Sequence, residues 1–172
     1  MYNGAYIQFL IHFHSDYDYF ECHEVLEEHW KTKPRGEREQ HWVGLIQIAV
    51  ALYHHRRSNW NGAERMMKSA LFILQNEKQH IEALGLEYPK LLLLIEDRLH
   101  IIRNHNSYTI LFLPFADSNL ENICIHLCKT KGLPWKETSS TPSEDIIHKH
   151  SRRNREDVIS ERNIQLQKRK QR

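Results

Sequence analysis

The residues of this chain whose types and spacing suit chemistry lie in the segment 19–30, Tyr-Phe-Glu-Cys-His-Glu-Val-Leu-Glu-Glu-His-Trp. Wound into a helix at about 100° per residue, this segment places His23 and Glu27 on the same face as its large apolar side chains. Its other glutamates, Glu21, Glu24 and Glu28, lie on the opposite face. An imidazole and a carboxylate directed toward an apolar core are costly unless they are hydrogen-bonded or hold a ligand. The spacing therefore predicts a polar site without fixing its chemistry.

A second polar pair lies in the next apolar segment. Residues 42–54 are apolar on nearly every side, which predicts a helix in the middle of a domain, and only Gln47 and His54 interrupt them. The same face carries Gly44 and Ala51, which are small enough to let a neighbouring helix approach closely. The short connection favours the preceding helix as that antiparallel neighbour. Four polar groups are then expected to converge: His23, Glu27, Gln47 and His54.

Two interpretations of this cluster follow from the residue types. In the first, the cluster is a buried hydrogen-bond network that fixes the register of the helices, as buried polar groups usually do. In the second, His23, Glu27 and His54 bind a divalent metal ion. Such an ion would support hydrolysis, with Glu24 as a candidate general base. The pattern His-Glu-x-x-Glu is not the His-Glu-x-x-His of zinc peptidases, so that analogy is not drawn.

A third interpretation is non-catalytic binding of a protein partner, a second copy of the chain or nucleic acid. Residues 144–172 carry nine Lys and Arg against five Asp and Glu, a net charge of +4, whereas residues 1–143 carry fifteen against seventeen, a net charge of −2. The candidate phosphate contacts are Arg56 and Arg57 after the 42–54 segment, and Arg152, Arg153 and Arg155 in the tail. Acidic residues interrupt the tail, and no nucleic-acid-binding motif accompanies either group. The sequence favours a structural or interaction module, with a metal-dependent hydrolase or metal-binding protein as the alternative.

Helical spacing and capping signals organise most of the chain. Asn3 is expected to cap the first helix and Asp18 the second, three residues before Glu21. The predicted helices run over about 4–14, from Asp18 to before Pro34, over about 37–58, from the break at Asn59–Gly62 onward with Gly85 as a stop, from Pro89 to about Asn104, and over about 118–131. Between the last two, Tyr108 to Leu113 is expected to be extended.

These elements predict an all-α fold, an antiparallel helical bundle with a weakly structured, basic C-terminal extension. The expected organisation is a bundle over residues 1–104, a C-terminal subdomain with one short helix over 105–137, and a linker and basic tail over 138–172. No apolar run approaches the ~18 residues that indicate a membrane span. The N-terminal apolar stretch lacks the basic leader and cleavage pattern of a secretory signal.

Cysteine and histidine usage adds two smaller expectations. Three cysteines form no disulfide-framework pattern, which fits a reducing, cytoplasmic compartment. Cys124 and Cys128 are four residues apart, as in half of a metal site, but packing of two small side chains is favoured. Among the thirteen histidines, five are expected at the surface: His12, His29, His41, His80 and His105.

Three blocks of this sequence, 20–30, 44–54 and 59–63, resemble domain-of-unknown-function family 309, a family of bacteria, archaea and plastids. The resemblance covers about residues 16–74 and implies an all-helical fold in which the His23 helix packs against the Gln47 and His54 helix. Cys22 stands where the family pattern usually has alanine. The resemblance brings no activity with it, and it implies that the part from about Asn104 is an extension of bacillus-type relatives. The signature positions it implies are His23, Glu24, Glu27, Trp30, Gln47, His54, Asn59 and Gly62.

Overall fold

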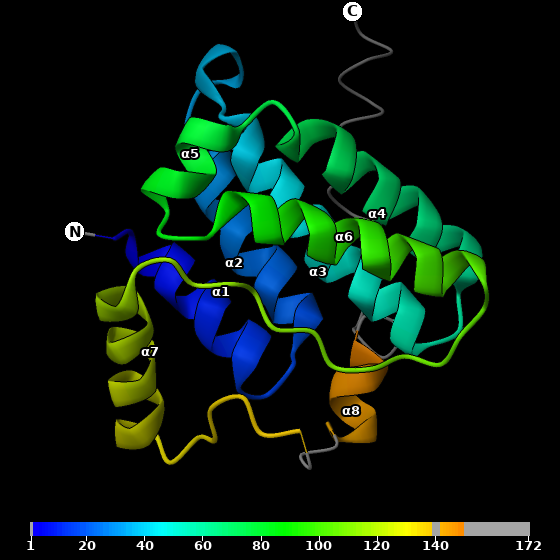
Figure 1. Cartoon of the computed structure of the whole chain (residues 1–172). Coiled ribbons are helices and arrows are strands. Elements are labelled where there is room, and N and C mark those ends of the chain that lie inside the picture. The colour runs from blue at the N-terminus through cyan, green and yellow to red at the C-terminus, as the bar shows by residue number, and fades with distance from the viewer. Residues whose placement is uncertain (1, 139–141, 150–172) are drawn as a thin grey trace, which may run out of the picture.

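The fold of the chain is all-α in the computed structural model, which describes residues 2–138 and 142–149 (Figure 1). Helices pack into a bundle, and the described residues form no strand beyond one isolated bridge between Leu86 and Phe115. The fold class predicted from helical periodicity is confirmed. The elements in chain order are α1 Gly4–His14, α2 Tyr19–Lys31, the short 3-10 helix η1 Arg35–Glu37, α3 Gln40–Arg56, α4 Trp60–Leu74, α5 Lys78–Ala83, α6 Tyr88–Arg103, α7 Ser118–Thr130 and α8 Glu144–Ile147.

Side-chain caps begin the first helices where the sequence predicts them. The Asn3 carboxamide accepts a hydrogen bond from the backbone N–H of Ala5 at 2.8 Å, and the Asp18 carboxylate accepts one from Glu21 at 3.0 Å. Asn59 does the same at the start of α4. Each cap satisfies a backbone donor that the first turn of a helix leaves without an intrahelical acceptor.

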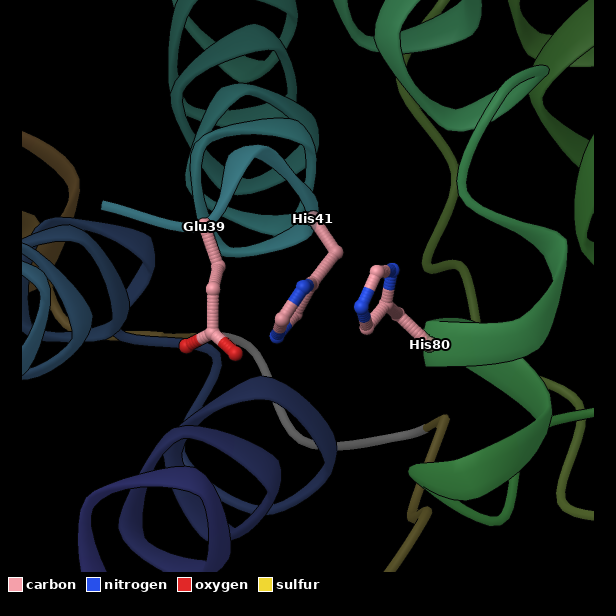
Figure 2. Close-up of side chains that lie close together, drawn as sticks. All are labelled: Glu39, His41 and His80. Atoms are coloured by element: carbon pink, nitrogen blue, oxygen red, sulfur yellow. The ribbon is translucent and has the colours of Figure 1, made fainter. Parts of the chain in front are cut away.

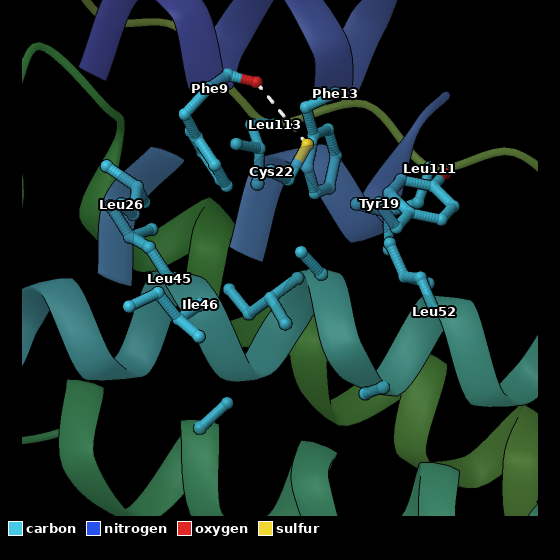
Figure 3. Packing of buried hydrophobic residues seen from close by; sticks show 14 of the residues in the cluster. Phe9, Phe13, Tyr19, Cys22, Leu26, Leu45, Ile46, Leu52, Leu111 and Leu113 are labelled. Atoms are coloured by element: carbon cyan, nitrogen blue, oxygen red, sulfur yellow. Dashed lines mark hydrogen bonds between the residues drawn. The ribbon is translucent and has the colours of Figure 1, made fainter. Parts of the chain in front are cut away.

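The helix α3 lies in the middle of the bundle, between α2 on one side and α4 on the other (Figure 1). Its Leu45, Ile48 and Leu52 are almost completely buried, as expected for a helix that is apolar on nearly every side. Figure 3 shows α3 packed beneath side chains of α1 and α2, where the Cys22 thiol donates to the Phe9 carbonyl at 3.6 Å. The sequence-predicted pairing of the His23 helix with the Gln47 and His54 helix is present.

The role expected of Gly44 needs a correction. Its smallness was expected to let the His23 helix approach, but a Cβ at Gly44 would lie only 2.5 Å from Leu74 Cδ2. Leu74 is the last residue of α4, so the close approach occurs on the α4 side of α3. Helical periodicity indicates that two residues share a face but does not identify the helix opposite that face.

The long connector between α6 and α7 returns along the bundle without regular structure (Figure 1). Its Leu111 and Leu113 and the Leu120 and Cys124 of α7 belong to the same hydrophobic core as α1 to α6. The predicted extended segment from Tyr108 to Leu113 thus packs as an irregular strap. Buried side chains of the helices form hydrogen bonds with the connector's backbone. The connector forms no helix or strand, so its buried N–H and C=O groups need partners from elsewhere.

Two further elements differ from the sequence expectation. The chain turns after Leu74 and forms the separate short helix α5 before the predicted stop at Gly85, where φ is +74°. Residues 142–149 include α8, and Lys149, which follows this helix, pairs with Asp18 at 2.6 Å and Glu21 at 2.7 Å. Most of the predicted basic tail, residues 150–172, lies outside the described residues. Among the residues that are described, no helix is long and apolar enough to cross a membrane.

Candidate functional site

The candidate site lies between α2 and α3, where a pocket of about 220 Å³ opens next to the start of α2 and the end of α3. Both helices contribute aromatic side chains to its wall. Because α2 and α3 run antiparallel, residues early in α2 meet residues late in α3. Seven residues line the pocket: Tyr19, Phe20, His23, Val50, Tyr53, His54 and Arg57.

His23 lies at the rim of the pocket instead of inside the core. Its side chain keeps 28% of its surface exposed, and that of Glu27 keeps 33%. The expectation that these two side chains are buried is therefore wrong. His23 Nδ1 lies 3.1 Å from the Glu24 carboxylate, and Nε2 lies 3.8 Å from that of Glu27, which also pairs with Lys31 at 2.9 Å. The face of α2 that packs on α3 is narrower than half of the helix. His23 and Glu27 lie at the edge of this face, so water reaches both side chains.

Gln47 lies apart from the pocket. Its side-chain oxygen is buried and has no hydrogen-bond partner among the described residues, so this oxygen does not bridge the two helices. Of the four residues predicted to converge, His23 and His54 line the pocket, whereas Glu27 and Gln47 are not part of its lining. The structure thus brings the two histidines to one pocket, places Glu27 next to His23 outside the pocket lining, and leaves Gln47 apart from them.

His54 is held by the turn between α3 and α4. The Asn59 Oδ1 accepts from the Gly62 N–H at 3.1 Å, which directs the Asn59 amide nitrogen at His54 Nδ1, 3.0 Å away. Since that nitrogen donates, Nδ1 is the acceptor and the ring proton of neutral His54 is on Nε2. A Cβ at Gly62 would lie 2.7 Å from Asn59 and 3.0 Å from the His54 ring. In this arrangement His54 presents an N–H donor toward its remaining partners and not a lone pair for a metal.

Arg57 is the cationic residue of the pocket; the sequence marked it as a candidate phosphate contact but not as a member of the predicted polar cluster. Its guanidinium lies over the Tyr53 ring at 5.2 Å, and its Nη1 donates to the Tyr53 hydroxyl at 3.1 Å. Its Nε is buried and has no hydrogen-bond partner in the described part of the chain. No carboxylate belongs to the pocket lining. The pocket therefore combines apolar walls with one guanidinium group, that of Arg57, whose Nε–H donor is not used.

Buried polar residues elsewhere serve the connector, and the sequence analysis missed them. The fully buried His14 accepts from the Leu113 N–H at 3.0 Å through Nε2 and donates to the Leu10 carbonyl through Nδ1. Burial lowers the pKa of His14 to about 3. His55 Nε2 donates to the Asn106 carbonyl at 3.0 Å, and Arg98 donates to the Thr109 carbonyl at 2.8 Å. A His or Arg at a helical core position is the sequence signal that could have found them.

His41 was expected at the surface and is instead buried, with 4% of its surface exposed. It lies in the first turn of α3, next to Trp42 and opposite α5, and a ring at that position is covered from two sides. His80, His29 and His105 retain partial or full exposure, as does His12. The neighbourhood of His41 forms a second group of metal-ligating side chains, distant from the pocket.

The cysteines are packing residues in this structure. Cys22, Cys124 and Cys128 are free and buried. Burial raises the pKa of the Cys22 thiol well above its ordinary value and that of Cys124 to about 12, so these thiols stay protonated. The groups of metal-ligating side chains found among the described residues contain no cysteine.

Comparison with known proteins places the chain among bacterial relatives. A protein-family model described as domain of unknown function (DUF309) matches residues 6–66. The "Uncharacterized protein YpuF" of Bacillus subtilis is 45% identical over 170 residues, which is 99% of this chain and 98% of the relative. An "Uncharacterized protein" of Aquifex aeolicus is 29% identical over 69 residues, 40% of this chain and 21% of the relative. No solved structure matches the chain significantly.

Proposed function

The chain belongs to the DUF309 family, whose model spans both helices of the pocket, and from the pocket's chemistry we propose that the protein is a non-catalytic binding module for a small anionic molecule. The observation that carries this proposal is Arg57, whose guanidinium is part of the pocket wall and whose Nε has no partner among the described residues. An unpaired buried donor is costly, and a carboxylate or phosphate is the acceptor that a guanidinium matches best.

The size and walls of the pocket specify the rest of the ligand. A pocket of about 220 Å³ is below the ~300–1,000 Å³ typical of sites for drug-sized ligands, so the ligand is small. Tyr19, Phe20 and Val50 supply apolar and aromatic surface for its body. The ligand class is therefore a small apolar or aromatic molecule that carries one anionic group. Binding is proposed without catalysis, because the lining holds no nucleophile paired with a general base.

Arg57 variants test this proposal with benzoate and phenyl phosphate as anionic probes and benzyl alcohol as a neutral one. Protein-observed NMR titration should show the anions binding at the pocket more tightly than the alcohol. Arg57→Gln should weaken anion binding by about tenfold or more, because a charge-assisted hydrogen bond is lost, and leave the alcohol unaffected. The anion affinity of Arg57→Lys should lie between those of Arg57→Gln and the unsubstituted protein, because lysine keeps the positive charge but lacks the planar guanidinium that binds an anion through two N–H groups.

Arg103→Gln is the matched control, since Arg103 lies outside the pocket lining and pairs with Glu64 at the surface. Its anion affinity should equal that of the unsubstituted protein. Equal benzoate affinity in the Arg57→Gln and unsubstituted proteins would reject the proposal. Chemical-shift changes confined to helices other than α2 and α3 would reject it as well.

A second candidate function is metal binding at the rim of the same pocket. Ligand atoms of His23, Glu24 and Glu27 lie within 4.8 Å of one another. The structure supports this candidate less well than anion binding, because each nitrogen of His23 faces a different carboxylate and one ion cannot use both. Hydrolysis through His23, Glu27 and His54 would further require the His54 turn to rearrange. Zinc titration of His23→Ala tests this candidate, because a metal ion bound at the rim of the pocket should be lost in that variant.

A further inference from the structure

A different cluster of polar side chains lies at the other end of α3. Glu39 is the N-cap of α3, His41 belongs to its first turn, and His80 comes from α5 (Figure 2). One ligand atom from each lies within 4.8 Å of the other two. His41 lies nine residues before Val50, the first residue of α3 in the pocket lining, which is roughly 14 Å along the helix axis, so this cluster is separate from the anion site.

His41 is the centre of the cluster and has an unused nitrogen. Its side chain is 4% exposed, and its Nδ1 has no hydrogen-bond partner in the part of the chain that the structure describes. The Glu77 carboxylate lies 3.9 Å from this nitrogen, which is too far for a hydrogen bond. Leaving a buried polar atom without a partner costs about 1–3 kcal/mol. An ion bound to His41 would remove part of that cost.

His80 faces His41 across the gap between α3 and α5, as Figure 2 shows. The two rings are stacked with centroids 4.8 Å apart and planes at 17°. The Glu77 Oε2 lies 2.6 Å from His80 Nδ1 but has no partner in hydrogen-bond geometry among the described residues. A small rotation of the exposed His80 ring would let Nδ1 donate to this oxygen, which leaves the Nε2 lone pair free for a metal. A carboxylate that holds the second nitrogen of a histidine is the usual outer partner of a metal ligand.

Glu39 supplies the carboxylate, which lies beside the His41 ring in Figure 2. One of its oxygens, Oε2, accepts from Lys33 at 2.8 Å and from Trp42 Nε1 at 3.3 Å. The hydrogen bond from Lys33 lowers the pKa of Glu39, which keeps the carboxylate charged. Lys33 is 44% exposed, so its pairing with Glu39 is a weak competitor for a cation.

The charge state of His41 also suits coordination. Burial lowers the pKa of His41 to about 4 and outweighs the opposing effect of the Glu39 carboxylate. A neutral imidazole is the form that binds a metal, so no proton has to be displaced from His41 at neutral pH.

We propose that Glu39, His41 and His80 form a binding site for one divalent transition-metal ion, such as Zn²⁺, with Glu77 orienting His80. Two imidazoles and one carboxylate are a ligand set that Zn²⁺ accepts, with water in the fourth position. Three atoms at most 4.8 Å apart surround a point within roughly 2.8 Å of each, so each moves by under about 1 Å to reach Zn–N and Zn–O distances of ~2.0–2.2 Å. Because the two rings are stacked, one ring must also rotate so that both lone pairs point at the ion. His80 is 55% exposed and can supply most of that movement.

The ion would join α5 to the start of α3. With six residues, α5 is too short to be stable as an isolated helix, so a cross-link through His80 holds it in place. Because the site exists only in the folded chain, zinc should stabilise the protein by mass action. This predicts a rise in Tm on addition of zinc that depends on the site's own ligands.

Calorimetric titration of ZnCl2 into chelator-treated protein purified without an affinity tag tests the proposal. The unsubstituted protein should bind one equivalent and show a raised Tm. His80→Ala and Glu39→Gln should each weaken the affinity by about tenfold or more, and Glu77→Gln should weaken it to a similar degree through the orientation of His80. His80 is exposed, so His80→Ala reports on binding even if His41→Ala does not fold.

His23→Ala and Lys33→Met are the matched controls. His23→Ala should bind zinc like the unsubstituted protein, and Lys33→Met should bind at least as tightly because a competing cation is gone. Absence of zinc binding at a Kd below about 100 µM, or unchanged affinity in His80→Ala and Glu39→Gln, would overturn the proposal. Loss of zinc in His23→Ala with retention in His80→Ala would overturn it too, and would place the ion at the rim of the anion pocket.

Discussion

At the scale of single residues, the buried imidazoles of this protein divide into two kinds. His14 uses both ring nitrogens in hydrogen bonds to backbone groups, one of them in the connector. His55 also binds the connector's backbone through Nε2, although its Nδ1 has no hydrogen-bond partner among the described residues, and no second histidine or carboxylate belongs with it to a metal-ligating group there. His41 is almost as buried but keeps an unpaired nitrogen next to another histidine and a carboxylate. A satisfied buried histidine indicates a structural role, whereas an unsatisfied one in such surroundings indicates a ligand.

His14→Phe tests the structural role of the first kind. Phenylalanine fills a similar volume but leaves the buried Leu113 N–H without an acceptor, so the free energy of unfolding should fall by about 2 kcal/mol at pH 7. Urea unfolding measures this difference. His12→Ala is the control, because it removes only a partly exposed pair with Asp16, and should cost under about 1 kcal/mol. Equal losses in both variants would contradict the assigned role of His14.

At the scale of elements, the α3–α4 contact shows how a small residue determines which helices approach closely. Gly44 lies against Leu74, and Gly62 lies against Asn59 and His54 at the turn that joins the same two helices. Both glycines are positions where any side chain would meet atoms already in place. The turn that directs His54 toward the pocket is therefore coupled to the packing of α4, and the candidate site depends on that turn.

Gly44→Ala should destabilise the protein, although alanine is the better helix former by about 1 kcal/mol, because the new methyl group lies within 2.6 Å of two Leu74 atoms. Leu74→Ala should make room for it. In a double-mutant cycle the two substitutions should couple by about 1 kcal/mol or more, with the double variant more stable than additivity predicts.

Gly4→Ala is the control for this cycle, since a Cβ at Gly4 meets nothing within 4 Å. It should leave stability unchanged or slightly raised. Additive effects of Gly44→Ala and Leu74→Ala would show that α4 does not approach α3 through this glycine.

At the scale of the whole molecule, one hydrophobic core joins α1 to α6 with the connector and α7. Its buried imidazoles make that core sensitive to acid. Burial lowers the pKa of both His14 and His55 in the folded chain, whereas in the unfolded chain these histidines take up protons near their ordinary pKa of about 6.5. The unfolded state thus binds more protons below neutral pH, and stability has to fall as the pH falls.

For His14, whose pKa is lowered to about 3, the loss between pH 7 and pH 5 amounts to about 2 kcal/mol, since only the unfolded state is protonated over that range. Urea unfolding of metal-free protein at pH 7, 6 and 5 measures it. His14→Phe lacks this histidine, so its stability should fall less steeply, and its deficit relative to the unsubstituted protein should shrink by about 2 kcal/mol at pH 5. A constant deficit from pH 7 to pH 5 would show that His14 is protonated in the folded chain.

The sequence by itself determined most of the helices and three of the side-chain caps. Periodicity and capping are local, since a helix repeats every 3.6 residues and an N-cap bonds within three residues, so Asn3, Asp18 and Asn59 were recognisable. The pattern also marked His23 and His54, which line one pocket, and Glu27, which lies next to His23, but it assigned Gln47 to the same cluster and Gly44 to the wrong neighbour.

Only the tertiary structure decided which distant side chains meet. Arg57 entered the pocket through a helix end, and Glu39, His41 and His80 came together across a separation of about forty residues, although none of them forms a sequence motif. Contacts of this kind depend on how helices cross and on where loops return the chain, which the spacing along one helix does not encode. The sequence thus specified most of the helices and the two histidines of the pocket. Packing of the helices decided that Arg57 joins these histidines and that Glu39, His41 and His80 meet in a second cluster.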